Sequence, residues 1–457
     1  MTLFNYISSQ IARVRKQNLS KLWPQIIGGT AVVVFVFLSG VLSGSERLLP
    51  YQMAASLKDS FQQVLTELPN YLQNVPVHFL HERRYEGSGV TVNHHGTDDQ
   101  LIMIGAFMDG SNEFRLVRRD GQIINQWRFQ FYDIYPNPEH LEFPPATNWN
   151  INTQGFVLNA DGSLVFNFAG MGLVKMNRCG VVTWALAAQT HHSVERNETG
   201  GYWVPNRRLI DTTTTSSYPF VDAPYFVDTI LHVSEDGVVM AEISIPELLT
   251  QNGLGPVLTA VENQVVMGDR FGIPEIIHLN DVEALPTSMA DQFPLFEAGD
   301  LMLSIRGYNM VFVFDPDTEK IKWHQTGPWI HQHDPDFLDD GILSLFNNRP
   351  FKDWRAPGEL HSAISEYNFA TGQSRNIFGD EPQNPFYSAI RGMHQRLDNG
   401  GILITEADSG RLFQINAQGE LVWEFINGYD ETRVAEITGG QAYPVDYFDV
   451  EDWSCPQ

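Results

Sequence analysis

The chain has 457 residues, 43% hydrophobic and 12% aromatic, so it can bury a large core and does not have the composition of a disordered protein. Its length favours two domains or a repeat architecture. The formal net charge of −26 argues against a nucleic-acid partner, and an anionic substrate would need a local cationic pocket.

The N-terminal part of the sequence predicts a membrane anchor at residues 26–44. This run is apolar and uncharged, and it is long enough to cross a bilayer as one helix. Basic residues precede it (Arg13, Arg15, Lys16 and Lys21), which predicts a cytoplasmic segment at 1–25 and a C-terminal domain on the periplasmic or extracellular side. A cleaved signal peptide is the alternative, but roughly 25 residues before the apolar run is long for one. We therefore expect an uncleaved single-pass anchor.

The next segment, 45–89, is expected to be a helical linker. Apolar residues recur at helical spacing over Tyr51–Leu72, which predicts one short amphipathic helix, and Pro76 ends it.

From about residue 90 to 457 the sequence repeats a short strand, a turn and a second strand that ends on an aromatic residue. Four units end on tryptophan, and two weaker units lie at 236–243 and 371–378; the tryptophans are Trp127, Trp184, Trp323 and Trp423. Six such units predict an all-β fold, a six-bladed β-propeller. We expect Arg433–Tyr443 to supply a late strand that closes the ring, which removes exposed edges. A loop is expected at 244–260.

Two cysteines occur, Cys179 and Cys455. In an exported protein they can pair and tie the C-terminal tail to the body, but two free thiols fit the sequence equally well.

Histidines precede short apolar runs in five of the expected units. They are His95, His192, His278, His333 and His394, whereas the second unit offers Asn152, Thr153 and Gln154. The innermost strand of each blade begins beside the propeller axis, so these side chains are expected to point at one centre. Taken singly, each histidine can simply hydrogen-bond a neighbouring blade. Taken as a set, together with Arg306, they predict a functional site.

The chemistry of this expected centre follows from Arg306. Several neutral imidazoles could bind a transition metal. A guanidinium, however, stays charged and presents donors that suit an oxyanion. We therefore expect a site for a phosphoryl-like or sulfuryl-like group, in which one neutral imidazole attacks and the other groups hold the oxygens. No metal and no cofactor are expected. The acidic residues Asp334, Asp336, Asp339 and Asp340 are interpreted as a solvated turn rather than a calcium site.

Several motifs resemble the bacterial arylsulfotransferase family over about residues 90–450. Gln332-His333-Asp334, with the run Asp340–Asn348 after it, resembles the family's QHD segment. His278-Leu279-Asn280 resembles its H-x-N motif, Ser304-Ile305-Arg306 its S-x-R strand, and His191-His192 its double histidine.

The resemblance implies a six-bladed propeller that moves a sulfuryl group from an aryl sulfate to a phenolic acceptor without a nucleotide sulfate donor. His333 would be the nucleophile that forms a sulfohistidine, and His278, Arg306 and His192 would bind the sulfuryl oxygens. We further expect His191, Asn280, Asn348 and His394 to bind substrate. The sequence departs from the family at Ser193, where an acid is usual, at Phe346-Asn347-Asn348, and in additional residues between His278 and Arg306.

Two other functions remain open from the sequence: a non-catalytic propeller that binds a ligand or partner, and a metal-dependent propeller enzyme that uses the histidine ring. The sequence leaves undecided the natural donor and acceptor, homodimer formation, the pairing of the cysteines and the cleavage of the anchor. It also leaves open the roles of His94, His95 and His394.

Overall fold

The computed structural model describes residues 79–455, with gaps at 95–99, 146, 149–150, 212–217, 219, 222, 260–272, 351–360 and 381–384. Of the preceding residues it describes Phe37, Leu38 and Gly40. Within these described residues, no helix is long and apolar enough to span a membrane. Apart from those three residues, the predicted anchor lies outside the described residues, as do the predicted helix at 51–72 and His95. The chain divides into two compact units, Met1–Val75 and Pro76–Gln457.

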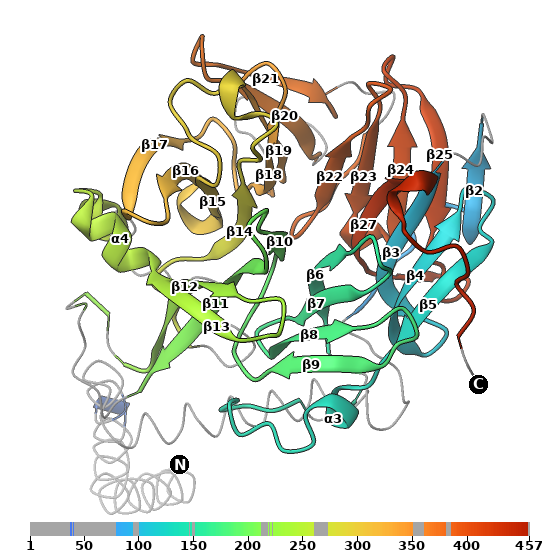
Figure 1. Ribbon diagram of the computed structural model, residues 1–457, viewed down its shortest axis with the longest axis horizontal. Helices are drawn as coiled ribbons and strands as arrows, with labels where there is room; N and C mark the ends of the chain where they lie inside the picture. The colour runs from blue at the N-terminus through green and yellow to red at the C-terminus, as the bar shows by residue number, and fades with distance from the viewer. Residues whose placement is uncertain are drawn as a thin grey trace, which may run out of the picture. The chain divides into compact units, whose positions relative to one another are not determined.

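Six antiparallel sheets in the second unit surround a common axis (Figure 1), which confirms the predicted all-β, six-bladed propeller. From the axis outward, blade 1 contains β27 (Ile437–Pro444), β3 (Gln100–Met108), β4 (Ser111–Arg118) and β5 (Ile123–Arg128). Blade 2 contains β6 (Thr153–Leu158), β7 (Leu164–Phe168), β8 (Gly172–Met176) and β9 (Val182–Leu186). Blade 3 contains β10 (Glu195–Arg196), β11 (Tyr202–Ile210), β12 (Tyr225–Val233) and β13 (Val239–Ser244).

The other three blades follow the same order. Blade 4 contains β14 (Leu279–Ala284), β15 (Leu301–Ile305), β16 (Met310–Asp315) and β17 (Lys320–Thr326). Blade 5 contains β18 (His333–Leu338), β19 (Ile342–Asn347), β20 (Ala363–Asn368) and β21 (Gln373–Phe378). Blade 6 contains β22 (Met393–Arg396), β23 (Ile402–Glu406), β24 (Arg411–Ile415), β25 (Leu421–Ile426) and β2 (Gly89–Asn93).

Two distant segments close the ring. The late strand β27 pairs with β3 and forms the innermost strand of blade 1, which confirms the predicted closure near Arg433–Tyr443. The early strand β2 pairs with β25 and adds a fifth strand to the outer edge of blade 6. A small additional sheet joins β1 (Leu80–Glu82) to β26 (Arg433–Ala435). The pairing of β27 leaves β3 without an open edge toward the axis.

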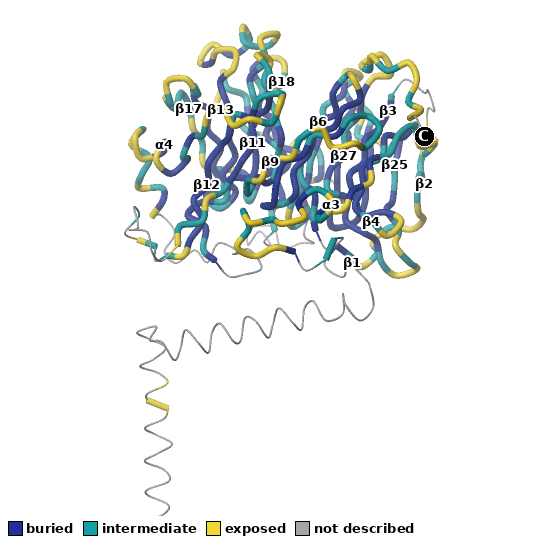
Figure 2. Tube along the Cα trace, turned by 60° about the horizontal axis from the view of Figure 1, so that its bottom comes forward, coloured by how far each residue is buried: buried dark blue, intermediate teal, exposed yellow. Residues whose placement is uncertain are grey.

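The alternation of side chains along each strand lets one blade pack against both of its neighbours. In β3, Leu101 and Met103 belong to the apolar cluster shared with blade 2, whereas Ile102 and Ile104 belong to the cluster shared with blade 6. Successive residues of a strand point to opposite faces, so this apolar run is buried on both sides. Every pair of adjacent blades shares such a cluster. Buried residues accordingly concentrate in the strands, and exposed residues lie mainly at the turns (Figure 2).

The recurring tryptophans hold neighbouring blades together. The indole N–H of Trp127 in blade 1 donates to the Asn177 carbonyl in blade 2, at 3.0 Å. The indoles of Trp184 and Trp423 each donate at 2.8 Å to a carbonyl in the next blade around the ring. The repeat in the sequence is therefore a repeat of contacts between blades.

The loop predicted at 244–260 is wrong, because this segment contains the helix α4 (Ile245–Gln251) and the 3-10 helix η2 (Gly255–Thr259). Pro246 fits the first turn of α4, and Leu248 and Leu249 are fully buried in the cluster between blades 3 and 4. The remaining short helices are α3 (Phe131–Ile134), η3 (Ala290–Gln292), η4 (Arg306–Tyr308), η5 (Ala407–Ser409) and η6 (Val445–Tyr447).

The two cysteines form a disulfide, with 5.6 Å between the Cα atoms of Cys179 and Cys455. Cys179 lies in the turn between β8 and β9, so the bond ties the C-terminal tail to the outer part of blade 2. Of the two alternatives that the sequence left open, the structure contains the paired one.

Candidate active site

Three of the predicted histidines meet at the inner ends of blades 3, 4 and 5. His192 lies before β10, His278 directly before β14, and His333 is the first residue of β18. The ring centroids of His192 and His278 are 5.0 Å apart, and those of His192 and His333 are 6.3 Å apart. Side chains that are far apart in the sequence therefore form one cluster, which we call the histidine cluster.

Asn348 fixes the orientation of His333, and two backbone carbonyls fix the orientation of Asn348. The Nδ1 atom of His333 lies 2.7 Å from Oδ1 of Asn348. The Asn348 amide nitrogen donates to the carbonyls of Ser388, at 3.0 Å, and Arg391, at 2.5 Å, so its oxygen must be the acceptor toward His333. Nδ1 therefore carries the proton. The Nε2 atom keeps its lone pair, has no hydrogen bond within the described residues, and belongs to a side chain that lines a cavity.

Burial keeps the imidazole of His333 neutral. Burial lowers its pKa to about 3, and the nearby charge of Arg306 acts in the same direction. At neutral pH the ring is therefore an unprotonated base, which is the form that can attack an electrophile.

Neighbouring residues outside the cluster orient His278 and His192. Nδ1 of His278 lies 2.8 Å from a carboxylate oxygen of Glu275, whose other oxygen accepts from Arg207 at 3.1 Å. The Nδ1 atoms of His191 and His192 lie 2.8 Å apart. Burial lowers the pKa of His191 to about 3 and that of His192 well below its usual value, so both rings are neutral.

Arg306 contributes a positive charge that forms no ion pair within the described part of the chain. It follows β15, is 7% exposed, and its guanidinium makes no hydrogen bond or ion pair with any described residue. Burial lowers the pKa of Arg306, yet a guanidinium stays protonated in proteins. Its charge lowers the pKa of both His331 and His333, which places it beside the histidine cluster. A buried cation without a partner is costly, so the arrangement favours binding of an anion.

A cavity of about 550 Å³ runs along the inner strands and reaches His192 and His333. Beyond the histidines its wall contains carboxylates from three neighbouring inner strands, which we call the acidic wall: Glu195, Asp281, Glu283, Asp334 and Asp336. The predicted solvated turn is therefore wrong for Asp334 and Asp336, which face this cavity, whereas Asp339 and Asp340 are exposed between β18 and β19. A turn-like sequence does not reveal that the first two acids belong to an inner strand.

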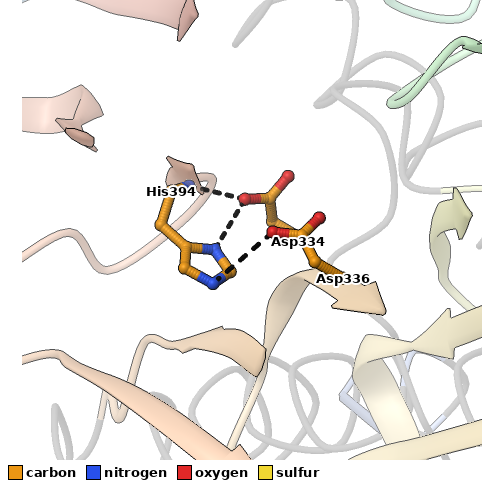
Figure 3. A group of neighbouring side chains, drawn as sticks. All are labelled: Asp334, Asp336 and His394. Carbon is orange, nitrogen blue, oxygen red and sulfur yellow. Dashed lines mark hydrogen bonds and ion pairs between the residues drawn. The ribbon is translucent and has the colours of Figure 1, made fainter. Parts of the chain in front are cut away.

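His394 lies in the acidic wall and outside the histidine cluster (Figure 3). Its Nδ1 is 2.8 Å and its backbone nitrogen 2.5 Å from Oδ2 of Asp334, while its Nε2 is 3.6 Å from Asp336. Asp334, Asp336 and His394 are spaced such that they could hold a metal ion. However, Nε2 also lies 2.6 Å from the Ser344 hydroxyl, so both ring nitrogens are already engaged.

The structure separates the residues for which a substrate-binding role was predicted. Asn280 lines the cavity, with its amide nitrogen donating to the Gln332 carbonyl at 2.7 Å. His191 lies behind His192, 3.4 Å from Asp228. Asn348 is fully buried and is engaged at both ends of its amide. We therefore regard Asn348 and His191 as supports of the histidines, and Asn280 and His394 as parts of the cavity wall.

Two further residues at the site, Glu275 and Arg391, were missed in the sequence, and a third, Gln154, was named there without a role. Glu275 precedes His278 by three residues and orients it, a spacing that a search for histidine partners could have found. Arg391 lines the cavity, pairs with Glu436 at 2.6 Å, and its carbonyl holds Asn348. Gln154, the residue that replaces a histidine in blade 2, accepts the backbone N–H of His192 at 2.5 Å. The position of Arg391 depends on chain folding that no sequence signal specifies.

The fold and site define a class: a six-bladed propeller with a cluster of histidines, of which His192 and His333 are neutral, and one arginine beside its axial cavity. The sequence model described as arylsulfotransferase (ASST) matches residues 156–428, which include the histidine cluster, Arg306 and all of the acidic wall. The chain belongs to this arylsulfotransferase family. No curated relative matches the sequence.

Solved structures with similar folds include a protein of unknown function from Bacteroides caccae, with 13% identity, 72% of this chain and 93% of that chain covered, and a TM-score of 0.45. Virginiamycin B lyase from Staphylococcus aureus has 10% identity, coverage of 74% and 88%, and a TM-score of 0.37. TolB from Acinetobacter baumannii has 9% identity, coverage of 76% and 67%, and a TM-score of 0.40. These similarities carry no argument about what the chain binds.

Proposed function

We propose that the protein transfers a sulfuryl group from an aryl sulfate to a phenolic acceptor through a sulfohistidine at His333. The family to which the chain belongs supports the reaction class. The observation that carries the assignment to these residues is the pairing of an unprotonated, correctly oriented His333 with an arginine that lacks a partner among the described residues.

In the first step, the lone pair of Nε2 of His333 attacks the sulfur of the aryl sulfate. An N–S bond forms, the S–O bond to the aryl group breaks, and the aryl oxygen leaves with the electron pair as a phenolate. The ring becomes cationic, and the hydrogen bond from Nδ1–H to Asn348 strengthens as this charge develops. Arg306 and the neighbouring imidazoles of His192 and His278 bind the sulfuryl oxygens during transfer.

In the second step, the acceptor phenol loses its proton and its oxygen attacks the same sulfur. The N–S bond breaks, its electron pair returns to Nε2, and the aryl sulfate product leaves. His333 is restored in its Nδ1–H form, so no proton remains bound to the enzyme. Splitting the transfer in this way replaces one difficult step by two easier ones.

The test is to incubate the full-length protein with 4-nitrophenyl sulfate and to look for a gain of one SO3 on the peptide containing His333 by mass spectrometry. We expect the adduct in the wild type and its removal on addition of a phenol. His333→Ala should lose both the adduct and the transfer. The matched control is His324→Ala, an exposed histidine on the outer strand β17, which should retain both. Transfer that survives in His333→Ala contradicts the assignment.

We also propose that residues 26–44 anchor the chain in a membrane and that the propeller lies on the periplasmic or extracellular side. The Cys179–Cys455 disulfide supports this, because disulfides persist in oxidising compartments. Protease treatment of spheroplasts, in which the outer face of the cytoplasmic membrane is accessible, should digest the propeller but spare a tag at the N-terminus. A propeller that is protected until the membrane is permeabilised contradicts this orientation.

A further inference from the structure

The acidic wall has more carboxyl groups than it has arginine side chains to pair with them. Five carboxylates face the cavity, and the arginines in its wall are Arg196, Arg391 and Arg396. Two of these arginines are engaged elsewhere: Arg391 pairs with Glu436 at 2.6 Å, and Arg196 pairs with Glu235 at 3.3 Å. The cavity therefore has an excess of carboxyl groups directly beyond the histidine cluster.

Burial favours the protonated forms of four of these carboxylates, those of Glu195, Asp281, Glu283 and Asp336. Burial, with repulsion from the neighbouring acids, raises the pKa of Asp281, Glu283 and Asp336 well above the usual value. The pKa of Glu195, which hydrogen-bonds Glu283, is raised to about 8. A bound cation would replace the protons and let the carboxylates ionise.

A second, independent feature of the same cavity also indicates a missing donor. Asn280 is 3% exposed and lines the cavity, and its amide nitrogen is used by the Gln332 carbonyl. Its amide oxygen has no hydrogen-bond partner among the described residues. A buried acceptor without a donor costs free energy, and an N–H or O–H group of a bound molecule would remove that cost.

The geometry favours an organic cation over a metal ion. The only group in the described chain with metal-like spacing is Asp334, Asp336 and His394, and both ring nitrogens of His394 are already engaged. A metal ion would have to break one of these hydrogen bonds. The cavity volume of about 550 Å³ lies in the range that encloses a small organic molecule rather than one ion.

We propose that the acidic wall binds the ammonium group of the acceptor, so that the preferred acceptors are phenols that carry a basic amine. This inference rests on the proposed sulfuryl transfer. Asp336 lies three residues beyond His333 on β18, and both side chains line the same cavity. A phenolic oxygen can therefore lie at the histidine cluster while an aminoalkyl substituent on its ring reaches the carboxylates.

The experiment compares three acceptors of similar size with 4-nitrophenyl sulfate as donor: tyramine, which is cationic, 4-ethylphenol, which is neutral, and 3-(4-hydroxyphenyl)propionate, which is anionic. We expect kcat/KM for tyramine to exceed that for 4-ethylphenol by about tenfold or more, with the anionic phenol slowest. Glu283→Gln and, separately, Asp336→Asn should each lower the ratio of tyramine to 4-ethylphenol several-fold. The ratio is taken within one variant, so partial loss of folded protein does not affect it.

The matched control is Asp398→Asn, an exposed acid outside the cavity, which should keep the wild-type ratio. Equal kcat/KM for tyramine and 4-ethylphenol overturns the proposal, as does an amine preference that survives in both cavity variants. Loss of the preference in EDTA and its return with Mg²⁺ also overturns it, because a metal ion would then occupy the wall. Calorimetry separates the two proposals. Tyramine that binds more tightly than 4-ethylphenol without any sulfuryl transfer supports the cation site and contradicts the proposed reaction.

Discussion

Burial shifts pKa values in opposite directions in the two parts of the axial cavity, the histidine cluster and the acidic wall. In the histidine cluster, burial lowers the pKa of His192 and His333, and the rings lose their positive charge. In the acidic wall, burial raises the pKa of Asp281 and Glu283, and the carboxyl groups lose their negative charge. Burial therefore reduces the charge of the titratable groups in both parts when no ligand is bound, and a ligand of opposite charge would offset the cost of restoring it.

Arg306 makes the two parts of the cavity differ in how well they retain charge. A guanidinium cannot release its proton, so the histidine cluster retains a fixed positive charge, whereas the acidic wall can discharge itself by binding protons. An anion should therefore bind at the histidine cluster over a wide pH range, whereas binding of a cation at the acidic wall should strengthen as the pH rises. The following changes test this contrast, beginning with the largest expected effect.

Replacing Arg306 should remove the fixed charge and make the two parts alike. We expect Arg306→Met to lower kcat/KM for sulfuryl transfer by about 10²- to 10³-fold, because a donor aimed at the developing charge is lost. Steady-state kinetics with 4-nitrophenyl sulfate measure this. Arg375→Met, which removes an exposed arginine on the outer strand β21, is the control and should stay near the wild-type rate. A rate for Arg306→Met within threefold of wild type contradicts the role of Arg306.

Changing Asn348 should alter the proton position on His333 without touching substrate. Asn348→Ala removes the acceptor for Nδ1–H, and we expect adduct formation to slow by about 10- to 100-fold. Asn348→Asp restores an acceptor but adds a carboxylate, which should raise the pKa of His333 and move the acid limb of the pH profile upward. An unchanged acid limb in Asn348→Asp would mean that Asn348 acts only in packing.

Removing the carboxyl group of Glu195 should remove the cost of ionising it in the folded protein at high pH. The pKa of Glu195 is raised from its unfolded value near 4.5 to about 8. Its contribution to stability is fully present below pH 4.5 and is lost as the pH rises toward 8. We therefore expect the stability of Glu195→Gln relative to wild type to improve between pH 5 and pH 8, by about 1 kcal/mol. Urea unfolding at both pH values measures this. Glu431→Gln, an exposed acid, should show no such change.

The smallest expected effect concerns the pH dependence of the first step. Because the pKa of His333 is lowered to about 3, its ring stays unprotonated from pH 8 down to pH 5. We expect the single-turnover release of 4-nitrophenol, read after alkaline quench, to change by less than about twofold over this range. An acid limb with a midpoint near 6.5 would indicate a solvated histidine and would break the contrast between the two parts.

The sequence predicts the ring and its histidines because both follow from short-range patterns. Trp127 and Trp423 mark the end of a repeat that bonds one blade to the next, and His192, His278 and His333 recur at the head of inner strands. Patterns of this kind depend on spacing along a strand, which the sequence displays directly.

The acidic wall could not be predicted in the same way. The pairing register shifts between Leu279 and Asp281 in β14, and between His333 and Asp336 in β18. Such a bulge changes which side chains face the axis, so simple alternation does not identify them. The helix α4 was missed for a related reason, because its stability comes from the burial of Leu248 and Leu249 against blades 3 and 4 rather than from a long periodic segment.

The late strand β27 has a consequence for when the protein becomes active. Residues Thr438–Pro444 supply one side of the axial cavity, yet they follow all the catalytic side chains in the order of synthesis. This wall therefore exists only after β27 has paired with β3. His333 and Arg306 precede β27 in the chain, so they become part of an enclosed cavity only at a late step of folding.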